Sequence, residues 1–139
     1  MNFFGRAVLG VTRQKLVRNL ITDTRPGRAL SRRFVAGETL DEAITAAVGL
    51  NAKGASVSLD HLGEHVADRT QAIAARDDYL ACLDAIGRHD IDGNISVKLS
   101  QLGMGFDDAL AAESLDALAR RALDVGTTVS VDMEESAVT

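Results

Sequence analysis

Hydrophobic and polar positions alternate in three short segments of the chain, and each segment ends on a charged residue. The segments are Val57-Ser58-Leu59-Asp60, Ile95-Ser96-Val97-Lys98 and Val129-Ser130-Val131-Asp132. Successive side chains of a β-strand point to opposite faces, so this alternation places aliphatic residues on one face and serine and the charge on the other. We therefore expect three strands, each with one apolar and one polar face.

Apolar residues at helical spacing occupy the segments before and between these strands. Thr39 can cap a helix that ends near Gly54, and further helices are expected over residues 66–89 and 107–125. The expected buried positions are Leu40, Ile44, Ala47 and Val48 in the first helix, Ile73, Leu80, Leu83 and Ile86 in the second, and Leu110, Leu115, Leu118 and Ala122 in the third. A strand–helix repeat of this kind is typical of parallel sheets.

The polar strand face separates two possible architectures. A strand in a doubly wound sheet has helices on both faces and is apolar throughout, which these strands are not. Serine followed by a charge suits the inside of a (β/α)8 barrel, whose sites lie at the carboxyl ends of the strands. We therefore favour a barrel over an open sheet. The predicted fold is α/β, with the first three βα units of a partial (β/α)8 barrel over residues 55–139 and an N-terminal helical region over residues 1–54.

A complete barrel needs eight strands and about 250 residues, so the sequence is interpreted as the front portion of a larger barrel. Its last strand would then be an unpaired parallel edge. We expect the isolated chain to be unstable or to aggregate.

Charge is distributed unevenly along the chain. Residues 1–33 hold eight Lys or Arg against Asp23 alone, a net charge of +7, and the remainder holds seven basic and nineteen acidic residues, a net charge of −12. The basic, partly apolar N-terminal segment could lie on an anionic membrane surface or pack as helices on its own domain. The acidic remainder argues against nucleic acid as a partner. Cys82 is the only cysteine, which excludes an internal disulfide and fits a reducing, cytoplasmic compartment.

Lys98 is an unexpected residue at the end of an otherwise apolar strand. Neighbouring parallel strands lie about 4.8 Å apart, so Lys98 should lie near Asp60 and Asp132 and stay protonated. Two interpretations remain open at this point. The three side chains form a closed ion-pair cluster, or the lysine keeps a free N–H for a ligand anion. Asp132 could also cap the turn that follows it.

A second motif, His61-Leu62-Gly63-Glu64-His65, matches the H-x-x-E-H pattern of a zinc hydrolase. In that chemistry His61 and His65 would bind the metal from one helical face and Glu64 would be the general base. His61 directly follows the expected strand end and Gly63 interrupts the first turn, so we expect no metal site. The segment 103–106, GMGF, is too short for a phosphate-binding motif and is expected to be a flexible loop.

The strand ends are similar to those of a known enzyme family. The segments VSLDHLGE, ISVKLSQLG and VSVDMEES, with RFVAGETLDEA upstream, resemble the FAD-dependent proline dehydrogenase family from about residue 30 to the end. The resemblance implies a (β/α)8 barrel that holds FAD at the carboxyl ends of its strands. It also implies that L-proline is oxidised to Δ1-pyrroline-5-carboxylate by hydride transfer to the flavin, and that a membrane quinone takes the electrons. The basic N-terminus would then contact the inner face of the membrane peripherally.

The resemblance also implies roles for individual residues. Lys98 would bind the proline, Asp132 would be the active-site acid beside it, and Met133 would lie against the flavin. Glu64 would form a gating ion pair with an arginine on the last helix of the family's barrel. In the family, most flavin contacts and the arginines that hold the proline carboxylate come from later elements. We therefore expect this chain alone to bind FAD weakly or not at all and not to turn over. A zinc hydrolase and a non-catalytic barrel remnant remain the alternatives.

Overall fold

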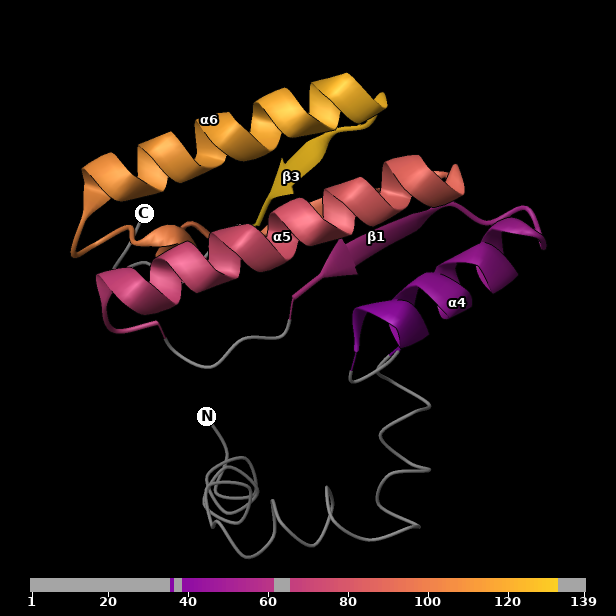
Figure 1. The fold of residues 1–139 in the computed structure, drawn as a ribbon, viewed down its shortest axis with the longest axis horizontal. Helices are drawn as coiled ribbons and strands as arrows, with labels where there is room; N and C mark the ends of the chain where they lie inside the picture. The colour runs from indigo at the N-terminus through magenta and orange to yellow at the C-terminus, as the bar shows by residue number, and fades with distance from the viewer. Residues whose placement is uncertain (1–35, 37–38, 62–65, 133–139) are drawn as a thin grey trace, which may run out of the picture. The chain divides into compact units, whose positions relative to one another are not determined.

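The structure, a computed structural model, describes residues 36, 39–61 and 66–132. The chain divides into two compact units, residues 1–42 and 43–139. The elements in chain order are α4 (Leu40–Asn51), β1 (Val57–Asp60), α5 (Arg69–His89), β2 (Gly93–Val97), the 3-10 helix η1 (Leu99–Leu102), α6 (Asp108–Val125) and β3 (Val129–Val131) (Figure 1). The three predicted strands and the three predicted helices are therefore present. The predicted boundary at residue 54 stays a prediction.

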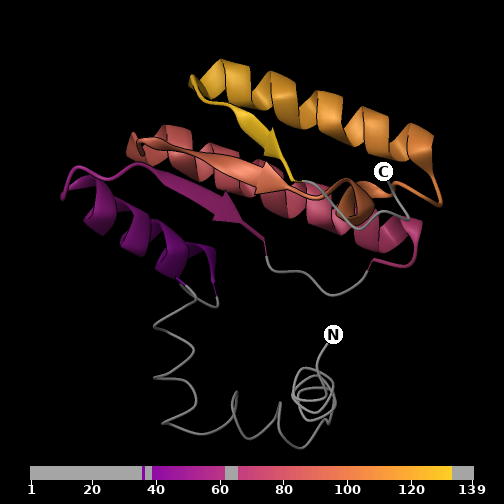
Figure 2. The same ribbon diagram turned by 180° about the vertical axis from the view of Figure 1, so that it is seen from behind.

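The strands form one parallel sheet in the order β1-β2-β3 (Figure 2). Leu59 pairs with Ile95 across the first interface, and Ile95 pairs with Val129 across the second. Each connection between neighbouring strands contains a helix, as parallel pairing requires. The βαβ repeat predicted from the sequence is confirmed.

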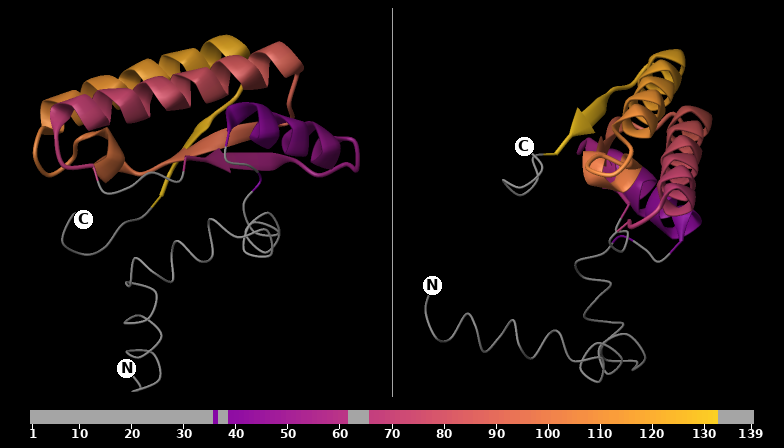
Figure 3. Two further views of the ribbon diagram at one scale, coloured as in Figure 1. Left: turned by 60° about the horizontal axis from the view of Figure 1, so that its bottom comes forward. Right: turned by 90° about the vertical axis from the view of Figure 1, so that its left-hand side faces the viewer.

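Helices α5 and α6 lie side by side on one face of this sheet (Figure 3). Ile95 and Val97 of β2 are completely buried beneath them, together with Leu83 of α5 and Leu118 of α6. Ser58, on the other face of β1, is exposed. One apolar and one polar strand face are thus observed, as the alternation predicts.

The buried face of α5 differs from the predicted one. It consists of Ala72, Ala75, Tyr79, Leu83, Ala85 and Ile86. Ile73 and Leu80, predicted to be buried, are only partly so. Small alanines let the helix backbone approach the sheet closely, and the long Tyr79 side chain then reaches the ends of the strands. Two burial predictions in the other helices are also wrong. Val48 of α4, expected to be buried, is 45% exposed, and in α6 Ser114 is buried whereas Leu115, the residue expected there, is only partly buried.

Side chains and glycines mark the ends of the helices. The Thr39 hydroxyl accepts a hydrogen bond from the Glu42 N–H at 3.3 Å, which confirms the predicted cap of α4. Gly103 has φ +113° and Leu102 beside it is fully buried. Residues 103–106, expected to be a flexible loop, connect η1 to α6 as a turn in which the Phe106 N–H donates to the Gly103 carbonyl.

Asn51, the last residue of α4, connects this helix to the start of β2. Its side-chain amide donates to the carbonyls of Ala55 (2.8 Å) and Asp92 (2.9 Å). Its side-chain oxygen accepts a hydrogen bond from the Asp92 N–H at 2.8 Å. The end of α4 is thereby attached to the amino end of the sheet. Among the helices that the structure describes, none is long and apolar enough to cross a membrane.

Candidate active site

Three charged side chains meet at the carboxyl ends of the strands. Asp60 is the last residue of β1, and Lys98 and Asp132 directly follow β2 and β3. The Lys98 Nζ lies 3.0 Å from Asp60 Oδ2 and 3.5 Å from Asp132 Oδ2. The strand pattern predicted this juxtaposition, and the structure confirms it.

The register of the sheet explains how one ammonium reaches both carboxylates. Ser96 pairs with Ser130, so continuing that register places Lys98 beside Asp132. Asp60, in contrast, pairs with Ser96, one side-chain level earlier on the same face. The long lysine stem lets its ammonium bridge these two levels.

The three groups hold one another in their charged forms. The pKa of Lys98 is raised, first by its hydrogen bond to Asp60, and the charges of Asp60 and Asp132 add to this, while burial opposes the shift. The pKa of Asp132 is lowered, first by the Ser96 hydroxyl, which donates to its Oδ1 at 2.5 Å, and then by Lys98. At neutral pH Lys98 is therefore an ammonium and Asp132 a carboxylate.

This cluster is open on one side. The Lys98 side chain is 36% exposed and that of Asp132 is 41% exposed. An ammonium has three N–H donors. In the described part of the chain, two carboxylates accept hydrogen bonds from it, those of Asp60 and Asp132. One donor thus remains for an anion from outside these residues, which favours a ligand site over a closed ion-pair cluster.

Two buried side chains, Tyr79 and Gln101, form a hydrogen-bond network next to Asp60, and neither was predicted from the sequence. The Tyr79 hydroxyl lies 3.2 Å from Asp60 Oδ1 and 2.8 Å from Gln101 Oε1. The Gln101 Nε2 donates to the carbonyl of His61 at 3.2 Å. A buried tyrosine needs a hydrogen-bond partner for its hydroxyl. Tyr79, the only tyrosine in the sequence, could therefore have indicated a polar contact next to the site.

The zinc motif receives no support. The His61 ring packs edge-on against Tyr79, with ring centroids 5.9 Å apart, and its Nε2 lies 3.6 Å from Asp78 Oδ2. Within residues 36, 39–61 and 66–132, no group of three or more His, Cys, Asp or Glu could hold a metal ion. Glu64 and His65 lie outside the described residues, as does Met133, so their predicted roles are not addressed by the structure.

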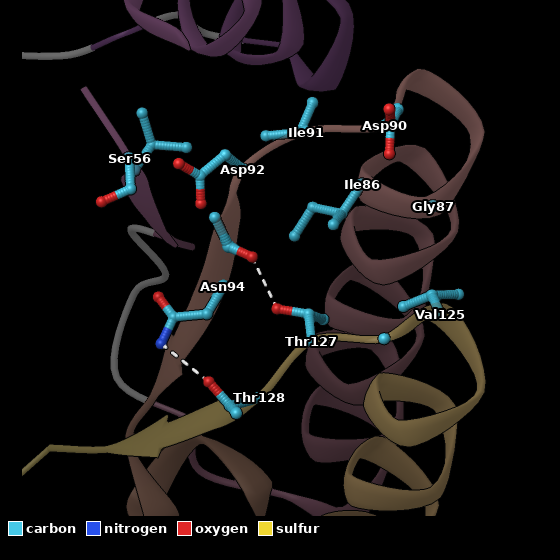
Figure 4. Close-up of a pocket in the computed structure, with 13 residues that line it drawn as sticks. Ser56, Ile86, Gly87, Asp90, Ile91, Asp92, Asn94, Val125, Thr127 and Thr128 are labelled. Atoms are coloured by element: carbon cyan, nitrogen blue, oxygen red, sulfur yellow. Dashed lines mark hydrogen bonds between the residues drawn. The ribbon is translucent and has the colours of Figure 1, made fainter. Parts of the chain in front are cut away.

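A cavity of about 520 Å³ lies at the opposite, amino end of the strands (Figure 4). Inside it the Thr127 hydroxyl donates to the Gly93 carbonyl at 2.5 Å, and the Asn94 amide donates to Thr128 at 3.4 Å. In barrels with parallel strands this end serves stability, whereas ligands bind at the carboxyl ends. The candidate active site is therefore the Lys98 cluster.

A parallel sheet with helices on its apolar face and charged groups at the carboxyl ends of its polar face defines part of a (β/α)8 barrel. The sequence model of the proline dehydrogenase family matches residues 43–139, and the chain belongs to this family. The match includes β1, β2 and β3 and all three charged residues of the cluster.

Two curated relatives agree with this assignment. Proline dehydrogenase 1 of Bacillus subtilis subsp. natto is 32% identical over 105 residues, which cover 76% of this chain and 35% of the relative. Proline dehydrogenase of Deinococcus radiodurans is 31% identical over 109 residues, with the same two coverages of 76% and 35%. The chain thus spans about a third of the length of the curated relatives it matches.

A solved structure supports the fold. The crystal structure of proline utilization A from Bdellovibrio bacteriovorus, inactivated by N-propargylglycine, superposes with a TM-score of 0.71 at 20% sequence identity. The superposition covers 81% of this chain and 14% of that one. The partial barrel predicted from the sequence is confirmed.

Proposed function

We propose that this chain forms the first part of the barrel of an FAD-dependent proline dehydrogenase, which oxidises L-proline to Δ1-pyrroline-5-carboxylate. One observation carries the proposal. A partly exposed ammonium, Lys98, is held between Asp60 and Asp132 at the carboxyl ends of the strands. Membership of the proline dehydrogenase family supplies the reaction in which such a site would act.

Lys98 binds the carboxylate of the substrate in this proposal. Its ammonium is fixed in place by Asp60 and Asp132 but keeps one N–H that no described residue takes. A hydrogen bond between a charged donor and a carboxylate is short and strong, so it orients the amino acid as well as binding it. Because the pKa of Lys98 is raised, this donor stays protonated over the whole neutral range.

Asp132 acts on the nitrogen of the substrate. It is a carboxylate at neutral pH because its pKa is lowered, and it accepts a hydrogen bond from the ring N–H. Oxidation removes the electron pair of a ring C–H bond as hydride and one proton from the nitrogen, and a C=N double bond forms. Asp132 holds the nitrogen in position while this proton leaves to solvent. Ser96, which donates to Asp132, keeps that carboxylate aligned.

FAD, when bound, supplies the hydride acceptor. The donor set fits this chemistry, because Lys98 and Asp132 can bind and orient an amino acid but neither is an oxidant. Met133 would lie against the flavin, and Glu64 would form the gating ion pair with an arginine of the last barrel helix.

We place the electron acceptor in the membrane, as a quinone. The net charge of +7 over residues 1–33 supports a peripheral contact with anionic lipid at the inner face, and the protein would otherwise be cytoplasmic. Removing residues 1–33 should abolish sedimentation with vesicles that contain anionic lipid and leave proline oxidation with a soluble dye unchanged. Equal sedimentation of both forms would refute the contact.

The test uses the protein tagged at its own chromosomal locus and purified from its own cells. L-proline should bleach a flavin absorbance near about 450 nm and reduce a dye, whereas D-proline should do neither. A Lys98→Met variant should raise KM for L-proline strongly, because the substrate carboxylate loses a charged donor worth about 1.5–3 kcal/mol.

A structural control separates loss of the site from loss of the fold. Arg121→Gln breaks the ion pair between α6 and α5, Arg121 Nε to Asp84 Oδ1 at 2.6 Å, and should leave KM unchanged. Purified protein without flavin and without proline-dependent dye reduction would refute the assignment and favour a non-catalytic barrel remnant. Zinc in place of flavin would favour the hydrolase based on His61, Glu64 and His65.

A further inference from the structure

The strongest unexplained feature outside the ion-pair cluster is a buried polar pair beneath it. Tyr79 is completely buried and Gln101 is 8% exposed. Tyr79 comes from the middle of α5 and Gln101 from η1, the short helix that follows β2. Both point to the end of β1, where Asp60 lies. Burying polar groups costs free energy unless they are hydrogen-bonded, and these two are bonded to one another and to Asp60 and His61.

The geometry of the pair fixes its orientation. The Gln101 Nε2 donates to the His61 carbonyl, so the Gln101 Oε1 faces Tyr79. The Tyr79 hydroxyl has one proton and two acceptors, Gln101 Oε1 at 2.8 Å and Asp60 Oδ1 at 3.2 Å. Asp60 uses its other oxygen, Oδ2, for the Lys98 ammonium at 3.0 Å. One carboxylate therefore connects a buried phenol to the partly exposed ammonium.

We propose that Tyr79 and Gln101 are positioning residues that act through Asp60 to orient the Lys98 ammonium for the substrate carboxylate. This proposal rests on the proposed function. Asp60 has the Lys98 ammonium at one oxygen and the Tyr79 hydroxyl within hydrogen-bond distance of the other, which restricts its rotation. The ammonium is therefore held against a carboxylate whose orientation the buried Tyr79 limits, and its remaining N–H keeps a defined direction.

A core tyrosine with no such role would behave differently. Its ring would pack, and phenylalanine in its place would leave the site unchanged. The pKa of Tyr79 is raised, first by burial and then by the charge and hydrogen bond of Asp60, so its hydroxyl keeps its proton throughout the neutral range. It is thus a permanent donor in the neighbourhood of a carboxylate.

The first experiment uses the protein purified from its own cells, grown with tyrosine labelled with carbon-13 at Cζ. Tyr79 is the only tyrosine of the 139 residues, and its resonance, identified as the one missing from Tyr79→Phe, responds to hydrogen bonding of the hydroxyl. Asp60→Asn should shift it, because the charged acceptor is lost. Asp84→Asn removes a carboxylate from the same helix, paired there with Arg121, and should not. Identical resonances in all three proteins would overturn the proposal.

The second experiment measures kinetics of the protein purified from its own cells. Tyr79→Phe should raise KM for L-proline about 5- to 10-fold and change kcat less than about 2-fold, as expected when a binding group loses its orientation. The matched control is Thr127→Val, which also removes one hydroxyl hydrogen bond but at the amino end of the sheet. It should leave KM unchanged. Equal kinetics of the two variants would overturn the proposal.

The two experiments separate failure of the inference from failure of the proposed function. If the wild-type protein does not oxidise L-proline, the proposed function is wrong, and the inference, which depends on it, is wrong for this substrate. If the wild type oxidises L-proline and Tyr79→Phe matches the wild type in KM, the function stands and Tyr79 only packs.

Discussion

Two helical glycines at equivalent positions have opposite surroundings. Gly49 is two residues before the end of α4, and Gly87 is two residues before the end of α5. A Cβ added at Gly49 would meet nothing within 4 Å. A Cβ added at Gly87 would lie 2.8 Å from Val125 Cγ1 and 3.0 Å from Val125 Cβ. The same change, glycine to alanine, should therefore have opposite effects at the two sites.

The magnitudes follow from two opposing terms. Alanine stabilises a helix over glycine by roughly 0.5–1 kcal/mol, and at Gly49 this gain should appear in full. At Gly87 the new methyl group would overlap Val125, and overpacking costs about 1–3 kcal/mol. Val125 cannot rotate its Cβ away, so α5 and α6 must separate slightly. We expect Gly87→Ala to destabilise the protein by about 1 kcal/mol.

Pulse proteolysis in increasing urea measures both effects at low protein concentration, where association is weak. A change of about 1 kcal/mol should move the midpoint by about 0.3–1 M urea, downward for Gly87→Ala and upward for Gly49→Ala. The double variant Gly87→Ala/Val125→Ala should recover part of the loss, because the 2.8 Å contact with Cγ1 is removed while the 3.0 Å contact with Cβ remains.

Two results would refute this reasoning. Gly87→Ala could stabilise the protein as much as Gly49→Ala, which would mean that the two helices do not pack as closely as described. Alternatively, the effects of Gly87→Ala and Val125→Ala could add without coupling, which would mean that the two side chains never meet.

Three further predictions follow from single residues. Ser96→Ala should raise the pKa of Asp132 toward its ordinary value, seen by carbon-13 NMR of the carboxylate. Because folding lowers the pKa of Asp132, this carboxylate stabilises the folded protein above about pH 4, and the contribution is lost as the pH falls through the folded pKa. Folding raises the pKa of Lys98, so the stabilising contribution of Lys98 is lost only as the pH rises above about 10.5. Burial, and then the charge of Asp78, raise the pKa of the Cys82 thiol, so alkylation of Cys82 at about pH 8 should be slower than that of a small free thiol. Asp78→Asn should restore only part of the alkylation rate, and a wild-type rate equal to that of the free thiol would contradict the prediction. Val131 on the edge strand β3 is 47% exposed, so Val131→Lys should reduce the concentration-dependent light scattering of the isolated chain, and equal scattering would show that this edge does not mediate association.

The strand positions and the polar face were predictable because period-two alternation is strong over four residues. Ser96 and Lys98 had to share a face once Ile95 and Val97 faced the core, and this placed the ammonium correctly. The sequence also predicted that Lys98 lies near Asp60 and Asp132. It did not predict the register, which places Lys98 level with Asp132 and one side-chain level beyond Asp60. Register depends on how neighbouring strands align along one another, and a single strand sequence does not encode that alignment.

The support for Asp60 could not be predicted for a related reason. At about 100° per residue, Tyr79 lies between Leu83 and Ile86, two of the positions expected to be buried, but the helical pattern gives no sign of what its hydroxyl contacts. In the structure the buried face of α5 also includes Ala72 and Ala75, and the Tyr79 hydroxyl lies 3.2 Å from Asp60 Oδ1. Helical periodicity indicates which side chains face the sheet but not which hydrogen bonds they make.

Asn51 sets a limit on how far the chain can be shortened from its amino end. Its side-chain amide both donates to and accepts from the backbone of Asp92, as a neighbouring strand residue would. A version of the protein that began at residue 55 would keep all three strands but would lose the three side-chain hydrogen bonds of Asn51. The first residue of any minimal barrel fragment should therefore lie before α4, even though α4 contributes no residue to the catalytic end.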